Sequence, residues 1–587
     1  MVYEVRPWTL EGLLPSPGTP EQAQFMEDLE KKVAAFEARR DELSPEMAET
    51  SFLEILQHYE SLYADIARLV AYSHLYFSEN TADQDALAFQ AKVEKFTADI
   101  KNRTLFFDLW WKSLDDESAE RLMKPSGDLH YYLESLRRFK PHTLSEAEER
   151  VINIKDVNGI SAMMTLYEMI TTGFTYHLTV DGEEKALTRG QLMTYAFSPN
   201  ADLRKAAYQE LYRVYGGQAE VLAQIYAARV RDWRAENVDL RGFRSPISVR
   251  NLDNDVPDAV VETLLEVIRK NATLFQRYFR FKAQALGMER LSRYDIYAPL
   301  TEAEKTYSFD EAVNLVDEAY REFSSTLADH ALRIIEERHL DAEVRPRKMD
   351  GAFCYSVLPD MTPWVLINFN GKINDVATLA HELGHGVHGQ MAGDHSPLTF
   401  HSALPLAETA SVFGEMLLTD KLLAEEKDVD VRRTLLNNVL SDAYATIVRQ
   451  AYFVLFEQQA HEMIEAGARR DELYAAYLEN LHEQFGDAVE LSEDFRLEWL
   501  AIPHIYRYPF YCYAYAFGNL LVLALYRKYK AVGREAFVPD YLRILSYGGS
   551  ASPHHIVSEA GFDMTSPDFW QGGFDLLEEM LDDLESL

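Results

Sequence analysis

One short segment carries two histidines and an acid at a spacing suited to holding and using a metal ion. His381, Glu382 and His385 lie in an otherwise mostly apolar stretch that runs from Asp375 to His388. On a helix, residues four apart share a face, so the two imidazoles would reach one ion together. The glutamate points about 100° away from the first histidine but still borders the site. It would therefore take a proton from metal-bound water instead of binding the metal itself.

A catalytic zinc ion normally takes three protein ligands and keeps one position for water. Glu408 is the third donor that the sequence offers, in the first turn of a second helix that we expect to begin at a proline three residues earlier. Gly384 and Gly386, each costing roughly 1 kcal/mol relative to alanine inside a helix, would permit close approach of the two helices. The alternative is an ordinary helix pair whose histidines form hydrogen bonds in the core. We expect one zinc ion per chain, held by His381, His385 and Glu408.

Other histidines and one acid lie near this motif. His388 follows three residues after His385, but the helix rises ~4.5 Å over that step, so we expect His388 to pack beside the ligands and not to bind the ion. Glu415 returns to the face of Glu408 and either orients a ligand histidine through its free N–H or is a surface acid. His395 and His401 belong to the connection between the helices, where a solvated or capping role is expected.

A second group of polar aromatic residues lies between positions 503 and 515, which contain one histidine and five tyrosines. Their O–H and N–H donors would suit the oxyanion of a hydrolase, although aromatic packing with incidental hydroxyls is the alternative. The run Tyr508–Tyr526 carries no charged residue. Its tyrosines, proline and asparagine predict a buried helix with a polar wall and argue against a membrane span.

The remaining patterns predict mainly helices, with apolar positions recurring every three or four residues over Glu21–Leu43 and Ser51–Phe77. A hairpin is expected near 176–188, with Asp181 and Gly182 at its turn, and a helix follows from residue 198 to Gly217. We therefore divide the chain into an N-terminal helical lobe, 1–190, and a catalytic lobe, 191–587.

A strand-rich patch over Gly351–Phe369 predicts two strands of a small sheet just before the metal helix. The second of these, Trp364–Phe369, would lie beside the ion. As an edge strand it would pair with an extended peptide, and as a core strand it would only support the site; the sequence is compatible with both.

The composition of the chain limits the classes of partner and of metal site that we expect. The 587 residues are 47% hydrophobic and 26% charged, as in a folded globular chain, and the net charge of −37 disfavours nucleic acid and anionic membranes as partners. The two cysteines, Cys354 and Cys512, exclude a disulfide framework and an all-cysteine metal cluster. The first residues lack a basic segment followed by an apolar one, so we expect no export signal and a cytoplasmic protein.

The HELGH motif, the downstream Glu408-x-x-Ser411-x-x-x-Glu415 pattern and the late His/Tyr segment together resemble the thimet oligopeptidase / oligoendopeptidase F family of zinc peptidases, in its bacterial oligoendopeptidase F branch. The resemblance implies a mainly α fold, with two helical lobes around a deep substrate channel and a small β-sheet beside the zinc helix. It also implies that the channel admits short unstructured peptides and excludes folded proteins.

The resemblance assigns roles residue by residue. Its zinc ligands are His381, His385 and Glu408, with Glu382 as general base. Transition-state and substrate-binding roles fall to His504, Tyr508 and Tyr515. Gly351, Ala352 and Phe353 match a flexible substrate-contacting loop. Tyr511 is a further substrate-binding candidate, but its role is undefined because Cys512 stands where many relatives of the mammalian type have a tyrosine.

We therefore expect a zinc metalloendopeptidase that hydrolyses internal bonds of short oligopeptides. The alternative is a zinc carboxypeptidase or dipeptidyl carboxypeptidase, which would recognise a terminal carboxylate through Arg507 or the group Arg345, Arg347 and Lys348. A more remote alternative is a non-catalytic peptide-binding protein. The sequence leaves the oligomeric state open.

Overall fold

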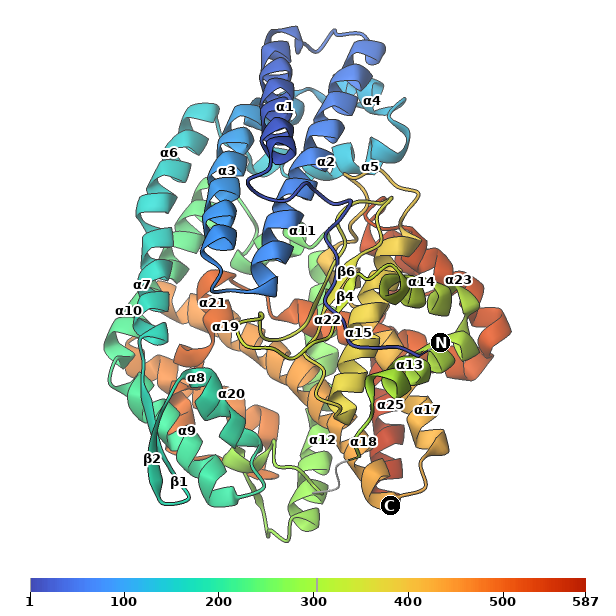
Figure 1. Cartoon of the computed structure of the whole chain (residues 1–587). Helices are drawn as coiled ribbons and strands as arrows, with labels where there is room; N and C mark the ends of the chain where they lie inside the picture. The colour runs from blue at the N-terminus through green and yellow to red at the C-terminus, as the bar shows by residue number, and fades with distance from the viewer. Residues whose placement is uncertain (1, 302–304) are drawn as a thin grey trace. The chain divides into compact units, whose positions relative to one another are not determined.

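The computed structural model describes residues 2–301 and 305–587 and is about 70% helical, which confirms the mainly α fold. The chain forms two compact units, each built from three separate stretches. The first unit contains residues 1–140, 304–425 and 528–562, and the second contains 141–303, 426–527 and 563–587. These units are interleaved along the chain, so the functional division near residue 190 stays a prediction. Figure 1 shows the course of the chain.

The helices of the first unit are α1 (Pro20–Glu37), α2 (Glu49–Glu79), α3 (Gln84–Ser113), α4 (Asp116–Met123), α5 (His130–Arg138), α13 (Phe309–Phe323), α14 (Ser325–Glu336), α15 (Ile373–Met391), α16 (Leu404–Ala407), α17 (Ser411–Glu425), α23 (Arg534–Ser546) and α24 (Pro553–Glu559). Those of the second unit are α6 (Glu146–Asn158), α7 (Ile160–Thr172), α8 (Arg189–Thr194), α9 (Ala201–Gly216), α10 (Ala219–Arg234), α11 (Pro246–Asp253), α12 (Asp258–Ala285), α18 (Val429–Ala443), α19 (Arg449–Glu465), α20 (Arg470–Phe485), α21 (Pro503–Arg507) and α25 (Pro567–Ser586). Helix α22 (Tyr513–Val532) begins in the second unit, and its residues from 528 onward belong to the first unit.

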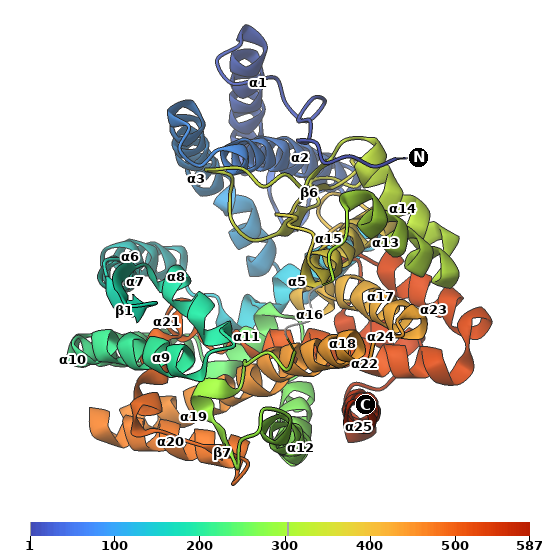
Figure 2. The same ribbon diagram turned by 60° about the horizontal axis from the view of Figure 1, so that its bottom comes forward.

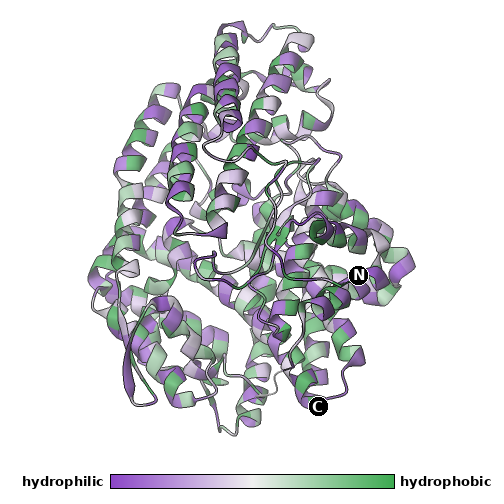
Figure 3. Ribbon diagram, viewed as in Figure 1, coloured by the Kyte–Doolittle hydropathy of each residue, from purple (hydrophilic) through white to green (hydrophobic). Residues whose placement is uncertain are grey.

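Amphipathic patterning explains most of these helices. Figure 3 shows hydrophilic and hydrophobic residues alternating along them, as expected when one stripe of each helix is buried. Helices α1, α2 and α3 pack together in the first unit around aromatic side chains such as Phe36, Phe52 and Trp111. The same core continues to Trp364 and Leu366 of the small sheet, so the N-terminal bundle supports the strands that precede the metal helix.

The sheet beside α15 has three short strands in the order β4 (Leu340–Asp341), β6 (Trp364–Leu366) and β5 (Phe353–Tyr355). Strand β6 pairs parallel to β4 and antiparallel to β5, with Cys354 opposite Val365. The idea that Trp364–Phe369 forms an edge is therefore wrong, because β6 is the central strand and is buried throughout. The edge strand is β5.

Helix α15 is surrounded within the first unit by α13, α14 and α17 (Figures 1 and 2). It begins at Ile373 with Lys372 at the N-cap, and Asp375 lies in its first turn. The Asp375 carboxylate accepts the backbone N–H groups of Asn370 and Lys372 at 2.8 and 3.0 Å, which ties the turn after the sheet to the start of the helix.

In the second unit, the expected hairpin forms from β1 (Tyr176–Val180) and β2 (Glu183–Leu187), and Asn200 caps α9 as its sequence indicates. The two-residue strands β3 (Leu291–Ser292) and β7 (Val489–Glu490) pair in parallel. The predicted buried helix after Tyr508 begins at Tyr513 as α22. Among the residues that the structure describes, no helix has both the length and the apolar character needed to cross a membrane.

Candidate metal centre and catalytic residues

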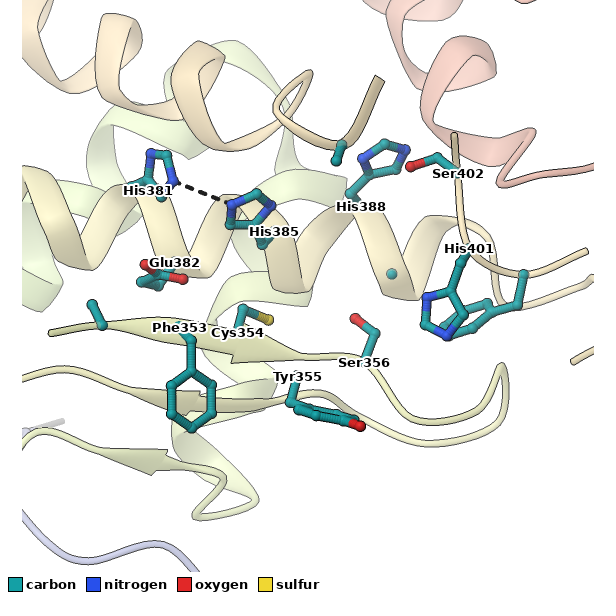
Figure 4. A pocket seen from close by; sticks show the side chains of 14 residues that line it. Phe353, Cys354, Tyr355, Ser356, His381, Glu382, His385, His388, His401 and Ser402 are labelled. Atoms are coloured by element: carbon teal, nitrogen blue, oxygen red, sulfur yellow. Dashed lines mark hydrogen bonds between the residues drawn. The ribbon is translucent and has the colours of Figure 1, made fainter. Parts of the chain in front are cut away.

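His381 and His385 project from the same side of α15, one turn apart (Figure 4). Their Nε2 atoms lie 3.2 Å from each other. Glu408 approaches from a different segment, and its Oε2 atom lies 3.4 Å from the Nε2 atom of each histidine. The three residues expected to be ligands thus present one atom each to a common point.

The size of this triangle matches a zinc ion. Donor atoms that bind zinc tetrahedrally at about 2.0–2.2 Å lie about 3.3–3.5 Å from one another. Two of the observed separations, both 3.4 Å, fall in that range, and the third, 3.2 Å, is within about 0.1 Å of it. Two imidazoles and a carboxylate are also the ligand types found in catalytic zinc sites with an open fourth position.

Glu408 lies at a break between two helices. The expected helix starts near Pro405, but α16 ends after one turn at Ala407, and α17 begins at Ser411. The Ser411 hydroxyl donates to Glu408 Oε2 at 2.6 Å, the same oxygen that faces the imidazoles. The close helix approach predicted from the glycines is present, since a Cβ atom on Gly384 would lie 2.6 Å from the Cα atom of Ser411.

Glu415 contacts the other nitrogen of His381. Its carboxylate pairs with Nδ1 of His381, so a proton held on Nδ1 leaves the Nε2 lone pair directed at Glu408. Burial alone would lower the pKa of His381, but Glu415, Glu408 and Glu382 together raise it to about 9. Of the two roles considered for Glu415, the contact with His381 supports orientation of a ligand histidine.

His385 has the opposite electrostatic environment. Burial and the charge of His381 lower its pKa to about 4, against the opposing effect of Glu408. A neutral imidazole is the form that binds a metal ion. The centre therefore combines a neutral donor with carboxylates that favour a cation.

Glu382 lies next to the two histidines on α15, on the flank of the helix that faces strand β5 (Figure 4). It is only 7% exposed, and its Oε2 atom has no hydrogen-bond partner in the described part of the chain. Burial, opposed by His381 and reinforced by Glu408 and Glu415, raises its pKa to about 7. A carboxyl group with a pKa near neutrality is suited to accept a proton and return it during one reaction cycle.

A cavity of about 580 Å³ joins these residues to β5. It is lined by Ala352, Phe353, Cys354, Tyr355, Ser356, His381, Glu382, His385, His388, Gly389, Phe400, His401, Ser402 and Ala407. Ala352 and Phe353 were expected to contact substrate, and both line this cavity, whereas Gly351 precedes it in a left-handed turn with φ +86°. His388 is buried and lies beside the ligand cluster, as expected.

His395 and His401, in the connection before Glu408, lie in different surroundings. His395 is held by Asp128 and the Ser546 carbonyl, both at 2.7 Å, so it anchors the connection. His401 instead lines the metal cavity together with Ser356 and Ser402, which sequence reasoning missed. Their order in the sequence carries no metal-ligand spacing. The path of the connection brings His401 and Ser402 to the cavity, and Ser356 reaches it from the end of β5.

The aromatic group of the second unit also comes together. The Nε2 atom of His504 lies 3.4 Å from the Tyr515 hydroxyl. Tyr511 packs against both, with its ring centroid 6.2 Å from that of His504 and 5.4 Å from that of Tyr515, and the Tyr508 ring centroid lies 5.9 Å from that of Tyr511. Burial and nearby arginines, Arg507 first, lower the pKa of His504. Tyr508 is 54% exposed, whereas Cys512 is fully buried.

Two family models match this chain. The model described as Peptidase family M3 covers residues 194–576, and the model described as Oligopeptidase F covers residues 110–176. The chain belongs to peptidase family M3. The family assignment confirms the resemblance to oligoendopeptidase F that the metal motif and the late His/Tyr segment indicate.

Curated relatives of this M3 chain are similar along nearly their whole length. Group B oligopeptidase PepB of Streptococcus agalactiae is 28% identical over 92% of this chain and 90% of its own. Oligopeptidase PepF of Bacillus subtilis is 26% identical over 99% of this chain and 87% of its own.

Solved structures share the fold of this M3 chain. A structure from Chlamydophila abortus has a TM-score of 0.88 at 24% identity and covers 99% of this chain and all of its own. The oligoendopeptidase-F structure from Enterococcus faecium has a TM-score of 0.72 at 23% identity, covering 96% of this chain and 98% of its own.

Proposed function

We propose that this M3 family member is a zinc-dependent endopeptidase that cleaves internal bonds of short, unstructured peptides. The observation that carries the proposal is the triangle formed by His381, His385 and Glu408, whose separations match tetrahedral zinc, with Glu382 buried beside it. The oligopeptidase names of the curated relatives support peptides as the substrate class.

A zinc ion in this triangle would polarise the scissile carbonyl and lower the pKa of water. The protein's own part in the reaction is then proton transfer and positioning. Glu382, in its ionised form, accepts a proton from the attacking water and donates it to the leaving amine. Glu415 keeps His381 in the tautomer that presents Nε2.

Strand β5 supplies a place for the substrate backbone. It is an edge strand, paired with β6 on one side only among the described residues, and Phe353, Cys354 and Tyr355 line the metal cavity. An extended peptide added to this edge would gain main-chain hydrogen bonds that do not depend on its sequence. We assign the peptide-pairing role to β5 in place of Trp364–Phe369.

His504 and Tyr515 would donate hydrogen bonds to the oxyanion that develops during attack. Their contact at 3.4 Å supports a shared role, and Tyr508 and Tyr511, which pack in the same group, would contact substrate. The alternative of aromatic packing alone is less consistent with the exposure of Tyr508.

The exopeptidase alternative needs a basic residue that is available to a terminal carboxylate. Arg345 and Lys348 instead pair with Asp341, at 2.7 and 2.9 Å, and Lys348 is buried among backbone carbonyl groups. Arg507 pairs with Glu168 at 2.8 Å. These ion pairs engage three of the four basic residues expected to bind a carboxylate, which favours the endopeptidase. The fourth, Arg347, is exposed and has no ion pair among the described residues, so the experiment below tests it through the peptide's C-terminus.

The decisive experiment uses an internally quenched peptide whose C-terminus is amidated. The wild type should cleave an internal bond and lose activity on chelation, and Glu382→Gln should keep its zinc but lose at least a thousandfold in kcat/KM. The matched control is Glu535→Gln, at an exposed glutamate of α23, which should behave like the wild type. Undiminished cleavage by Glu382→Gln would refute the mechanism. Cleavage only of peptides with a free C-terminus would favour the exopeptidase, and zinc binding without hydrolysis would favour a peptide-binding protein.

A further inference from the structure

The segment Tyr508–Cys512 connects α21 to α22 and carries two members of the aromatic group described above. We call this segment the tyrosine turn, after Tyr508 and Tyr511. Inside it, the Tyr511 N–H donates to the Tyr508 carbonyl at 3.1 Å. A short irregular segment lacks the repeating hydrogen bonds of a helix, so its shape depends on the side chains that contact its backbone.

Phe510, at the centre of the tyrosine turn, has a strained backbone. Its φ is +58°, in the left-handed region that is unfavourable for a bulky side chain, whereas a glycine would adopt it without strain. The Phe510 ring is 1% exposed, and its centroid lies 4.6 Å from that of the His461 ring. A strained conformation of this kind persists only where the surrounding structure imposes it.

Two charged side chains contact the backbone of the turn directly. Glu457 of α19 is completely buried, and its carboxylate accepts the Phe510 N–H at 3.0 Å. Arg250 of α11 donates from Nε to the Pro509 carbonyl at 3.2 Å, and its side chain is 15% exposed. Neighbouring backbone groups of the turn are thus held from two different helices.

Arg229 of α10 holds the segment just before the turn. It donates from Nε to the Tyr506 carbonyl at 3.2 Å and from Nη2 to the Arg507 carbonyl at 3.5 Å. Burying a charged side chain costs free energy that an apolar residue of similar size would not cost. The convergence of three such side chains on the backbone of residues 506–510 therefore indicates that this backbone has to be held in one shape.

The shape of the turn determines where its two tyrosines lie. Tyr511 follows Phe510 directly, so a change of the Phe510 backbone to the right-handed region would redirect the chain that carries Tyr511. In the observed shape the Tyr511 ring packs against the rings of His504, Tyr508 and Tyr515. The side chains that fix the turn therefore also fix the arrangement of the aromatic group.

We propose that Glu457, Arg250 and Arg229 are positioning residues of the peptidase, which hold the tyrosine turn in the shape that presents Tyr508 and Tyr511 to the substrate. This inference rests on the proposed function, in which these tyrosines contact substrate. The three side chains act through the backbone of the turn and not on the reacting atoms. Their loss should therefore weaken substrate binding more than the chemical step.

Glu457→Leu tests the proposal, because leucine fills the buried space but cannot accept the Phe510 N–H. We expect KM for the quenched, amidated peptide to rise at least tenfold, kcat to fall no more than about threefold, and zinc affinity to stay unchanged. Glu457→Gln keeps an oxygen acceptor and should restore KM to within about twofold of the wild type. A general loss of stability would lower the folded fraction, and with it kcat, but not raise KM. Leu440→Ala, which opens a cavity at a buried position of α18, is the control for that loss.

Arg250→Met is the second variant and carries the test if Glu457→Leu does not fold. It keeps most of the aliphatic stem but removes the donor to Pro509, so KM should again rise, at least about threefold. A wild-type KM in every variant that folds would overturn the proposal. A KM of Glu457→Leu that Glu457→Gln does not restore would also overturn it.

Hydrogen exchange of the full chain without substrate, followed by mass spectrometry, separates this inference from the proposed function. In both variants the amides of residues 508–515 should exchange at least about tenfold faster than in the wild type, while those of α15 should exchange at the wild-type rate. Unchanged exchange of residues 508–515 in the variants would overturn the inference, whatever the peptidase result. A wild type that hydrolyses no peptide would refute the proposed function, and the exchange rates would still show whether these side chains hold the turn.

Discussion

A Cβ atom on Gly384 would lie 2.5 Å from the carbonyl oxygen of Ala410. All three contacted atoms on the α17 side, the carbonyl carbon and oxygen of Ala410 and the Cα of Ser411, belong to the backbone, which cannot move out of the way as a side chain would. Glu408 lies only two residues before Ala410. The spacing between α15 and α17 therefore sets the distance of the carboxylate from the two histidines.

Gly384→Ala should push α17 away from α15 and separate Glu408 from His381 and His385. We expect a loss of about 1–3 kcal/mol in unfolding free energy, as for other overpacked interfaces, and at least tenfold weaker zinc binding. Urea unfolding and competition with a chelator measure the two effects. The control is Gly386→Ala, whose Cβ would meet only side-chain atoms, chiefly the terminal Cδ1 atom of Ile334 and, at 3.6 Å, the Sγ atom of Cys354. Equal zinc affinity of Gly384→Ala and Gly386→Ala would contradict the argument.

Glu415→Ala should weaken zinc binding about 10–100-fold, because the pairing with Nδ1 that orients His381 is lost. Glu415→Gln should recover part of the affinity, since its amide oxygen still accepts a hydrogen bond from Nδ1. Chelator competition at constant pH measures both variants. If both Glu415→Ala and Glu415→Gln bind zinc as tightly as the wild type does, Glu415 has no positioning role.

The sequence was sufficient to predict most of the helices, among them the helix with the HELGH motif. It was also sufficient to predict the three residues, His381, His385 and Glu408, whose side-chain atoms come together. HELGH spacing places His381 and His385 by helical geometry alone, and Glu408 was identified because a catalytic zinc requires a third ligand. The break between α16 and α17 was not predicted, since the one-turn helix ending at Ala407 has the same local sequence signals as a longer one.

Pairing between distant segments was also beyond the sequence. Whether Trp364–Phe369 is an edge or a centre depends on β4, a strand of only two residues whose pattern is too short to recognise. His401 and Ser356 reach the cavity through tertiary packing, and no spacing rule connects them. Interleaving of the two compact units likewise follows from long-range contacts that periodicity does not encode.

Ser411→Ala should lower zinc affinity severalfold, because the Ser411 hydroxyl fixes the Glu408 oxygen that faces the imidazoles. A matched control is close by in the sequence. Thr409 is also fully buried, but its hydroxyl has no hydrogen-bond partner among the described residues, so Thr409→Val should leave zinc affinity unchanged and unfolding free energy equal or higher. The same loss of affinity in both variants would show that general packing, and not the hydrogen bond, is responsible.

Tyr515→Phe should reduce kcat about 10²-fold with little change in KM or zinc content, if its hydroxyl stabilises charge that appears only in the transition state. Tyr526→Phe, on the same helix α22, serves as a control for loss of a tyrosine hydroxyl and should retain activity. Peptide hydrolysis under single-turnover conditions isolates the chemical step. A rise in KM with unchanged kcat would instead assign Tyr515 to substrate binding.

The buried carboxyl of Glu457 should make the unfolding free energy of the protein depend on pH, independently of the metal centre. It is fully buried in the second unit, and burial raises its pKa to about 8, despite the N–H of Phe510 and the charges of Arg250 and Arg229. Between its unfolded pKa, about 4.3, and the folded value, the folded state holds one more proton than the unfolded state. Stability from this group is therefore complete at low pH and is lost as pH rises through 8.

Glu457→Gln removes this titration while keeping an acceptor for the Phe510 N–H. We expect the difference in unfolding free energy between pH 5.5 and 8.5 to shrink by on the order of 3 kcal/mol relative to the wild type. Urea unfolding at both pH values measures the change, and Glu479→Gln, at an exposed site on α20, controls for loss of one charge. Glu457→Gln and the wild type differ over this pH range only in the ionisation of Glu457 in the folded state. If their unfolding free energies change in parallel between pH 5.5 and 8.5, the carboxyl of Glu457 is already ionised at pH 5.5.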